Sequence, residues 1–292
     1  MPMSFNQTII EEFRANAGRV GGPFEGGDLL LLTTTGARTG QQHTVPLGYV
    51  RADGLLLVVA SAAGAPDHPQ WYRNLLAHPV VRVELGAETF EAIAVPAEGD
   101  RRDELFEAVV RAAPGYGDYQ AHTGRVLPVV VLERDATEPR EVTSLADKLL
   151  EVHTWLRGQL RHVRTEVDAY FADGPPGGGR PPGLGLQIRQ HCLAFCEGLT
   201  HHHTGEDAAI FPALARSHPH LRPTLDRLGE EHRVVGRIKD ELVALLSGIG
   251  VADPEGFRAE LTRMSAELEA HLAHEEDTLL PVLADIPFPP GR

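Results

Sequence analysis

The sequence has little cysteine and a clear deficit of positive charge. The two cysteines, Cys192 and Cys196, lie four residues apart in a helical pattern. We expect them to be small core residues that stay reduced in a cytoplasm, with a redox or metal role as the alternative. Lysine and arginine number 27 against 41 aspartates and glutamates, which gives a net charge of -14. Such a chain does not neutralise phosphates in bulk, which argues against nucleic acid and anionic membrane surfaces as partners.

Long apolar runs are also missing from the sequence. No run approaches the roughly 18 residues that a transmembrane helix needs, so we expect no integral membrane segment. The first residues lack the charged and apolar regions of a secretion signal. These absences predict a cytoplasmic protein. With 292 residues, 42% of them hydrophobic, the chain is long enough for two packed domains.

Histidine is unevenly distributed between the two halves of the chain. Of the 15 histidines, His43, His68, His78 and His122 lie in the first half, and the others follow residue 150. We therefore expect two regions with different chemistry.

The first region has the pattern of short strands joined by turns. Asp53-Gly54, between two apolar segments, is typical of a tight hairpin turn. Helices are expected at 5–17, 69–78 and 102–112. The pattern predicts a small antiparallel barrel of the α+β kind. The predicted strands are Leu29–Thr34, Val45–Val50, Leu55–Ala60, Val80–Leu85, Thr89–Val95 and Val126–Leu132.

The second region is helical nearly to its end. A polar segment, 135–144, is expected to be a linker, and Ser144 is a candidate N-cap for the helix after it. A Gly/Pro stretch covers 174–185. The second helix is expected to be interrupted near Gly198 or Gly205. Four long helices with short connections predict an up-and-down bundle. The expected helices are 145–171, 186–217, 221–247 and 254–284.

One motif occurs twice in the helical region. His202-x-x-x-Glu206 is followed by Pro212, and His271-x-x-x-Glu275 is followed by Pro281. Residues four apart share one helix face, so each copy presents an imidazole and a carboxylate on the same side. The repeat extends to the preceding helix of each pair, where a histidine lies on the apolar stripe. The six candidate metal ligands are His153, His202, Glu206, His232, His271 and Glu275.

These residue types indicate a nitrogen/oxygen metal site. A buried glutamate is costly unless it is paired or bound to metal. Imidazole and carboxylate ligands suit iron, manganese or zinc. Six side chains favour two ions bridged by both glutamates, with positions open for dioxygen, peroxide or nitric oxide. A structural zinc is the alternative. We interpret His201, His203 and His274 as surface groups or groups that orient the ligands, and His191 as too distant to bind the same metal.

The same residues resemble the hemerythrin-like, HHE cation-binding family over about 145–285. The resemblance implies a non-haem di-iron centre in a four-helix bundle. Oxygen-carrying hemerythrins place a second histidine four residues after the one in the third helix, and here that position is Gly236. The site is therefore similar to the symmetric His/Glu branch of the family, and reversible oxygen transport is not inherited.

A glycine-flanked basic turn follows the first predicted strand. Gly36 and Gly40 let backbone amides approach an anion, Arg38 adds charge, and Thr39 adds a hydroxyl donor. This composition suits a phosphate group. By itself it is also typical of an ordinary surface turn.

The sequence around this turn resembles the deazaflavin-dependent nitroreductase family over about 5–134. The resemblance lies in Thr-Thr-Thr-Gly-Ala-Arg-Thr-Gly-Gln, His-Pro-Gln-Trp-Tyr-Arg-Asn-Leu and Pro-Gly-Tyr-Gly-Asp-Tyr-Gln. It implies a split β-barrel that binds coenzyme F-420 and delivers hydride to nitroaromatics, quinones or similar acceptors. FMN, haem or no cofactor are the alternatives. Three positions depart from the family pattern: Ala37, His43 and Ala113.

The resemblance assigns roles by position. The coenzyme would bind at the glycine-flanked turn, which contains Gly36, Arg38, Thr39 and Gly40. Arg38 and Thr39 would hold its phosphate. The deazaflavin would lie near Ser61, Trp71 and Asn74. The alternative for Trp71 is a helix residue that closes the barrel mouth. Tyr116 and Tyr119 would line the acceptor pocket as candidate catalytic proton donors.

Together these observations predict a two-domain oxidoreductase. A split β-barrel (1–134) would be followed by a linker (135–144) and a hemerythrin-like four-helix bundle (145–286). The barrel would pass a hydride from F-420 to a nitro, quinone or similar acceptor. The bundle would hold two irons and bind, reduce or sense dioxygen, peroxide or nitric oxide. The alternative is a sensor with a degenerate cofactor domain. A homodimer is an open alternative to a monomer.

Overall fold

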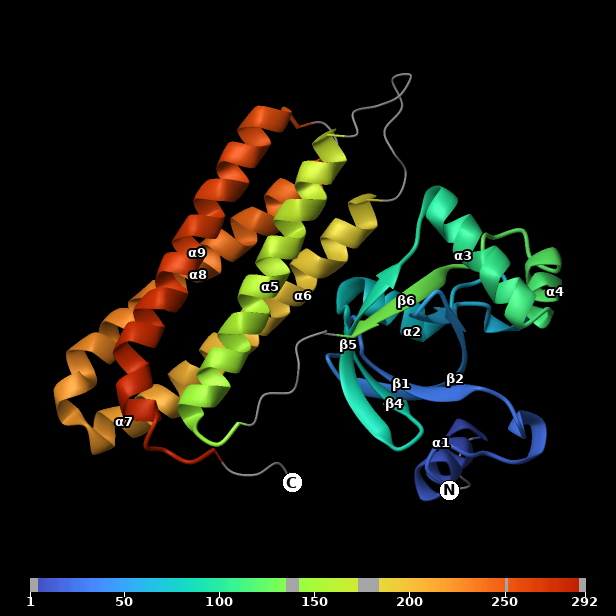
Figure 1. Ribbon diagram of the computed structural model, residues 1–292, viewed down its shortest axis with the longest axis horizontal. Helices are drawn as coiled ribbons and strands as arrows, with labels where there is room; N and C mark the ends of the chain where they lie inside the picture. The colour runs from blue at the N-terminus through green and yellow to red at the C-terminus, as the bar shows by residue number, and fades with distance from the viewer. Residues whose placement is uncertain (1–4, 135–141, 173–183, 250–251, 289–292) are drawn as a thin grey trace. The chain divides into compact units, whose positions relative to one another are not determined.

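The computed structural model describes residues 5–134, 142–172, 184–249 and 252–288 (Figure 1). The chain divides into two compact units. The barrel unit comprises Met1–Ala136 and Pro175–Ala194, and the bundle unit comprises Thr137–Gly174 and Phe195–Arg292. Most of the expected linker and of the Gly/Pro stretch lies outside the described residues. Among the described helices, none is long and apolar enough to cross a membrane.

Six antiparallel strands form a closed barrel in the order β1-β2-β3-β6-β5-β4. Every predicted strand is present, because short runs rich in β-branched and other apolar residues between turns suit a buried sheet. The largest shifts are at the starts of β2 and β6; at β6, Pro128 has no amide hydrogen for the ladder. The strands are β1 (Leu29–Thr35), β2 (Gln42–Ala52), β3 (Leu55–Val59), β4 (Val80–Leu85), β5 (Glu88–Pro96) and β6 (Val129–Arg134).

The predicted hairpin joins β2 to β3. Ala52 pairs with Leu55, so Asp53 and Gly54 are the two turn residues. Both have positive φ, 50° and 79°, as this tight turn requires.

The described residues 5–134 also form four α-helices. They are α1 (Phe5–Ala15), α2 (Gln70–Ala77), α3 (Gly99–Ala112) and α4 (Gly115–Ala121). The sequence predicts the first three. It misses α4, because seven residues with two glycines carry too little helical periodicity.

The first part of α6 (Leu184–Gly205) belongs to the barrel unit. Gln190 is fully buried there, and its Nε2 donates to the carbonyls of Leu75 at 2.8 Å and Ala94 at 3.1 Å. His191, also buried, pairs with Glu133 at 3.2 Å. Two main-chain carbonyls of the barrel unit thus accept hydrogen bonds from a side chain about 100 residues further along the chain.

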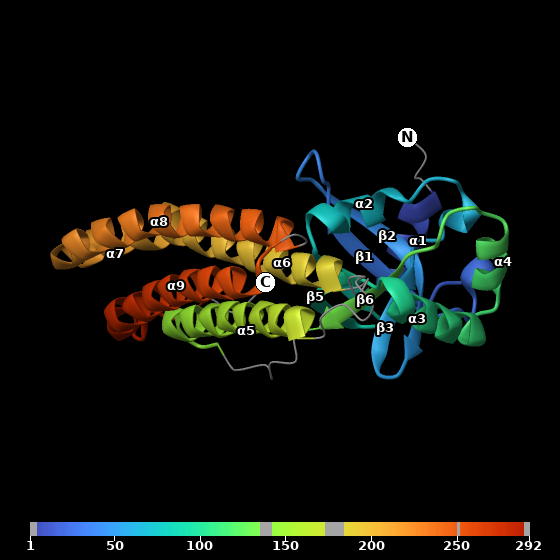
Figure 2. The same cartoon turned by 90° about the horizontal axis from the view of Figure 1, so that it is seen from above.

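The bundle unit is formed by long helices that follow the predicted order. α5 and α8 both pack against α9, and Figures 1 and 2 show α5 beside α9 along its length. These elements confirm the predicted fold class of a β-barrel followed by a helical bundle. The helices are α5 (Leu145–Ala172), the remainder of α6, α7 (Phe211–Ser217), α8 (Arg222–Ser247) and α9 (Pro254–Leu283).

The expected interruption of the second helix occurs after Gly205 and not at Gly198. Glu206–Ile210 form a π-helical turn that leads into α7. Pro212, which cannot donate to the preceding turn, follows directly. The helix continues through Gly198, where a Cβ would overlap the indole of Trp155, so close packing accounts for this glycine.

Ser144 caps α5 as predicted. Its Oγ accepts from the Asp147 amide at 3.1 Å. The Asp147 carboxylate in turn accepts from the amides of Thr143 and Ser144 at 3.1 Å and 3.0 Å. This reciprocal cap satisfies backbone donors at the start of the helix.

Candidate metal centre and coenzyme site

The six predicted metal ligands converge inside the bundle unit. They come from α5, α6, the π-helical turn, α8 and α9, and none has a side chain more than 7% exposed. The repeat therefore brings all of its histidines and glutamates to one buried point.

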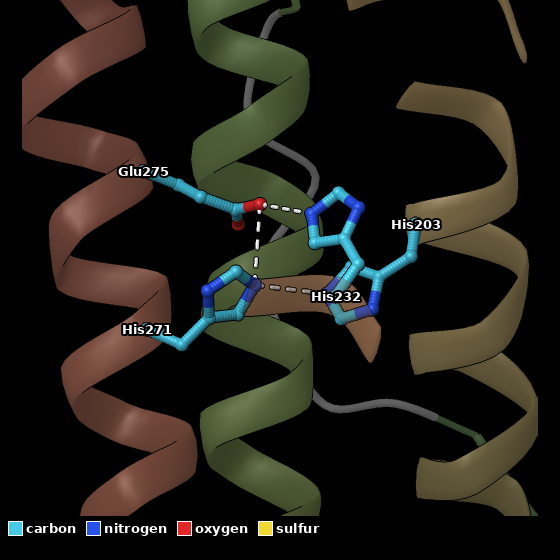
Figure 3. Close-up of side chains that lie close together, drawn as sticks. All are labelled: His203, His232, His271 and Glu275. Atoms are coloured by element: carbon cyan, nitrogen blue, oxygen red, sulfur yellow. Dashed lines mark hydrogen bonds and ion pairs between the residues drawn. The ribbon is translucent and has the colours of Figure 1, made fainter. Parts of the chain in front are cut away.

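The imidazole nitrogens lie in pairs at a spacing that suits metal binding. The Nε2 atoms of His153 and His202 are 2.9 Å apart, and those of His203 and His271 are 3.2 Å apart. Metal–nitrogen bonds of about 2.0–2.1 Å hold neighbouring ligand nitrogens about 3 Å apart. Figure 3 shows the second pair beside His232 and Glu275. Each pair could therefore belong to one ion.

Each glutamate contacts a histidine from each copy of the repeat. Glu275 Oε2 lies 3.2 Å from His153 Nε2, and Oε1 lies 2.8 Å from His232 Nε2. Glu206 Oε2 lies 3.5 Å from the Nε2 atoms of both His202 and His232. Oε2 of each glutamate is buried without a hydrogen-bond partner among the described residues. Buried carboxylate oxygens without donors fit a pair of cations that they would bridge.

Three acidic side chains hold the outer nitrogens of the ligand histidines. Asp207 lies 2.8 Å from Nδ1 of His232, and Glu276 lies 2.8 Å from Nδ1 of His153. Glu231 lies 3.3 Å from Nδ1 of His271. A proton held at Nδ1 leaves the Nε2 lone pair for a metal.

The sequence interpretation did not identify these three acids. A signal for two of them is present, because Asp207 and Glu276 each follow the ligand glutamate of their copy of the repeat. Glu231 has no such counterpart, since Val152 stands at the matching position before His153.

His203 differs from the expectation of a surface or orienting group. It is 8% exposed and belongs to both clusters of side chains able to hold a metal. Its ring stacks on His232, with ring centroids 4.0 Å apart and planes 8° apart. His201 is exposed, and His274 contacts Glu231 at 2.9 Å, outside the cluster.

Burial controls the protonation of this cluster in the metal-free protein. Burial, with the neighbouring charge of Glu275, raises the pKa of Glu206 to about 10. Burial also lowers the pKa of His203 to about 2, so this imidazole is neutral at neutral pH. Burial opposes ionisation of Glu275, but hydrogen bonds from the surrounding histidines outweigh it and lower its pKa. A metal would displace the proton of Glu206, which couples metal binding to proton release.

In the barrel unit, the glycine-flanked turn links β1 to β2. The Gly36 amide donates to Gln41 O and the Gly40 amide to Gly36 O, both at 2.8 Å. Gly40 has φ 66°, and a Cβ on Gly36 would lie 2.6 Å from Thr39 Oγ1. The side chains of Arg38 and Thr39 are exposed. The turn is compact and presents a cation and a hydroxyl to solvent.

Asn74 from α2 is 1% exposed and holds this turn. Its Oδ1 accepts from the Ala37 amide at 3.2 Å, and its Nδ2 donates to Thr34 Oγ1 at 3.1 Å. Both polar atoms of the Asn74 side-chain amide therefore help to hold the turn in place. Trp71, one turn earlier, is 7% exposed and packs in the barrel core, which is the position expected of a residue that closes the barrel.

Ser61 lies at the start of a strained loop. The next residues, Ala62 and Ala63, have φ of 46° and 51°, which is rare for alanine. Arg125 holds the loop by donating to Ala60 O at 3.0 Å, Ser61 O at 2.7 Å and Ala65 O at 2.8 Å. One guanidinium thereby fixes the main chain around Ser61.

The two candidate catalytic tyrosines lie on α4. Their rings meet edge to face with centroids 6.1 Å apart. Tyr116 packs against the core below α3, and burial raises the pKa of its hydroxyl. Tyr119 is 40% exposed.

Comparison with known proteins identifies both units. Residues 6–134 match the F420H(2)-dependent quinone reductase family, and residues 144–283 match the hemerythrin HHE cation binding domain. The chain is a member of the F420H(2)-dependent quinone reductase family with a hemerythrin HHE domain attached. The expectations of a deazaflavin-dependent oxidoreductase type of enzyme and of a fusion are confirmed.

Two relatives of the barrel unit come from Mycobacterium tuberculosis. An F420H(2)-dependent quinone reductase of Mycobacterium tuberculosis is 40% identical over 126 residues, which cover 42% of this chain and 85% of the relative. A second protein of that family and organism is 35% identical over 103 residues, or 35% of this chain and 87% of the relative. The solved structure of an F420-H2 dependent reductase is 39% identical, covers 36% of this chain and 94% of its own, and has a TM-score of 0.34.

Proposed function

We propose that the barrel unit transfers a hydride from reduced F-420 to a quinone, nitro or similar acceptor. The observation that carries this is the 40% identity to a quinone reductase over 85% of that relative. The bound coenzyme supplies the hydride, and one added proton completes the two-electron reduction of a quinone to a hydroquinone.

The proposed roles of the side chains follow their positions. Arg38 and Thr39 would bind the coenzyme phosphate, with Gly36 and Gly40 allowing its close approach. Ser61 would meet the deazaflavin, while Asn74 and Trp71 would position the turn and the barrel end. Tyr116 has a protonated hydroxyl at neutral pH, so it would donate a hydrogen bond to the acceptor, with Tyr119 at the solvent side.

The test is oxidation of reduced F-420 by a soluble quinone, followed through the visible absorption of the coenzyme. We expect turnover with the full chain and a loss of coenzyme affinity in Arg38→Ala. Arg51→Ala, an exposed arginine elsewhere on β2, is the matched control. Tyr116→Phe is expected to lower kcat more than Tyr119→Phe does. Absence of turnover with every acceptor class would contradict the proposal.

We propose further that the bundle unit holds two iron ions. The donor set, the two nitrogen pairs and the buried partnerless oxygens of Glu206 and Glu275 support this. When bound, two irons supply a two-electron centre able to bind, reduce or sense dioxygen, peroxide or nitric oxide. His153 and His202 would hold one ion, His232 and His271 the other, and both glutamates would bridge them. Manganese and zinc are the alternatives to iron for the same donors.

The fusion would place a hydride source and a two-electron acceptor in the same chain. This coupling is tested by adding reduced F-420 to the diferric protein without oxygen. Bleaching of the ferric absorption at a rate independent of protein concentration would support transfer within one chain. Failure of the iron to be reduced would remove the coupling and leave both activities standing.

A second candidate is a sensor whose barrel no longer binds coenzyme. Ala37 and His43, which replace basic residues of the family pattern at the turn, favour it. A titration of the purified chain with F-420 separates the two. Saturable binding supports the reductase, and absence of binding together with an iron-loaded bundle supports the sensor.

A further inference from the structure

His203 is buried, at 8% exposed, although His201 and Thr204, on either side of the His202-His203 pair, are exposed to solvent. Successive helix residues differ by about 100° in direction, so His202 and His203 diverge from α6 on either side of the bundle axis. His202 meets His153, and His203 meets His271. One helix thus delivers an imidazole to each half of the cluster.

The contact between His203 and His271 is the kind that a metal would replace. Their Nε2 atoms are 3.2 Å apart, so without metal the two rings share a single proton between them. Glu231 faces the other nitrogen of His271. Once His271 gives its Nε2 lone pair to an ion, His203 loses that partner. The His203 ring already points toward Nε2 of His271, as Figure 3 shows, so its own Nε2 lies beside the position that such an ion would take.

The helix opposite His203 provides room for this arrangement. Gly236 lies four residues after His232 on α8, and a Cβ there would have no neighbour within 4 Å. A hollow of about 180 Å³ beside it is lined by His203, His232, Gly236 and Lys239. Glycine at position 236 has no side chain that could reach the ion, and the imidazoles that line this hollow are those of His203 and His232.

We propose that His203 is a seventh metal ligand, which forms a three-imidazole set with His232 and His271 and takes the place of the histidine absent at Gly236. The two ions would then differ in their number of imidazole ligands, because the second ion would have only those of His153 and His202. The inference rests on the proposed di-metal centre. It concerns an x position of the first His-x-x-x-Glu motif, between the two ligand positions His202 and Glu206.

The test compares three variants in iron content and in Mössbauer spectra of the metal-loaded full chain. His203→Phe keeps an aromatic ring stacked on His232 but removes the ligand nitrogen. His201→Ala is the matched control on the exposed side of the same helix. The double variant His203→Phe/Gly236→His returns an imidazole from α8. Circular dichroism and thermal unfolding of the metal-free variants establish that each is folded.

We expect the wild type and His201→Ala to give two distinct iron signals of equal area. His203→Phe should bind one of its irons at least tenfold more weakly and lose the corresponding signal, and the double variant should regain it. If folded His203→Phe keeps both irons with wild-type affinity and spectra, His203 is a packing residue and the inference is wrong. If the wild type itself binds no pair of irons, the proposed centre fails first, which is a distinguishable result.

Discussion

Asp207 accepts a hydrogen bond from Nδ1 of His232 at 2.8 Å, and this bond points the Nε2 lone pair of His232 into the cluster. Glu276, its counterpart in the repeat, does the same for His153 at 2.8 Å. The duplicated motif therefore carries two orienting acids as well as its ligands.

The first prediction concerns these two acids. Asp207→Asn and Glu276→Gln should each weaken metal binding by about 10–100-fold, because the histidine loses its fixed tautomer and part of its basicity. Competition with a chelator of known affinity measures the loss. Asp277→Asn, an exposed acid on α9, serves as the control and should bind metal as the wild type does. Equal affinity in all three variants would show that the outer acids do not act on the metal.

The second prediction concerns packing between α5 and α6. Gly198→Ala should lower the free energy of unfolding by about 1–3 kcal/mol, because the new methyl group must displace the Trp155 indole. Gly158→Ala on α5 meets only the tip of Arg161 at 3.9 Å and should be neutral or stabilising. Urea unfolding of the metal-free proteins measures both. A Gly198→Ala protein as stable as the wild type would exclude the steric explanation.

The third prediction is a pH dependence at the start of α5. Hydrogen bonds from Thr143 and Ser144 lower the pKa of Asp147 to about 2, below its ordinary value of 3.8. A carboxylate whose pKa is lower in the folded state stabilises the fold fully above 3.8 and loses that effect as the pH falls toward 2. Asp147→Asn should thus be less stable than the wild type near neutrality, with the difference shrinking across this interval. A difference that stays constant with pH would refute the charged cap.

The fourth prediction concerns the loop that carries Ser61. Arg125→Lys cannot reproduce donation to three carbonyls at once, so the strained segment at Ala62 and Ala63 should relax. We expect the dissociation constant for F-420 to rise about tenfold, which corresponds to about 1.4 kcal/mol. Arg73→Lys, an exposed arginine on α2, is the control. Isothermal titration measures both, and unchanged affinity in Arg125→Lys would separate this loop from the coenzyme.

The strands, the long helices and the convergence of the six ligands could be predicted because their signals are local. Turn residues and short apolar runs define the strands, and a spacing of four residues places His202 with Glu206 and His271 with Glu275 on shared helix faces. The duplicated order then brings both copies to one site.

Other features depend on which surfaces meet, and the sequence pattern does not contain that information. His202 and His203 are adjacent, and only the direction of α6 in the bundle turns both of them inward. A glycine is typical of a helix break, but Gly198 lies within a continuous helix. A glycine stands there because the Trp155 ring on another helix leaves no room for a Cβ. The place of Gln190 in the barrel unit likewise depends on carbonyls distant in the sequence.

Anaerobic titration of the metal-free full chain with ferrous iron measures whether the bundle unit holds two ions. We predict saturation at two irons per chain, with the second lost in Glu275→Gln because that carboxylate contacts histidines from both copies of the repeat. Saturation at one iron per chain, or unchanged binding of two in Glu275→Gln, would contradict it.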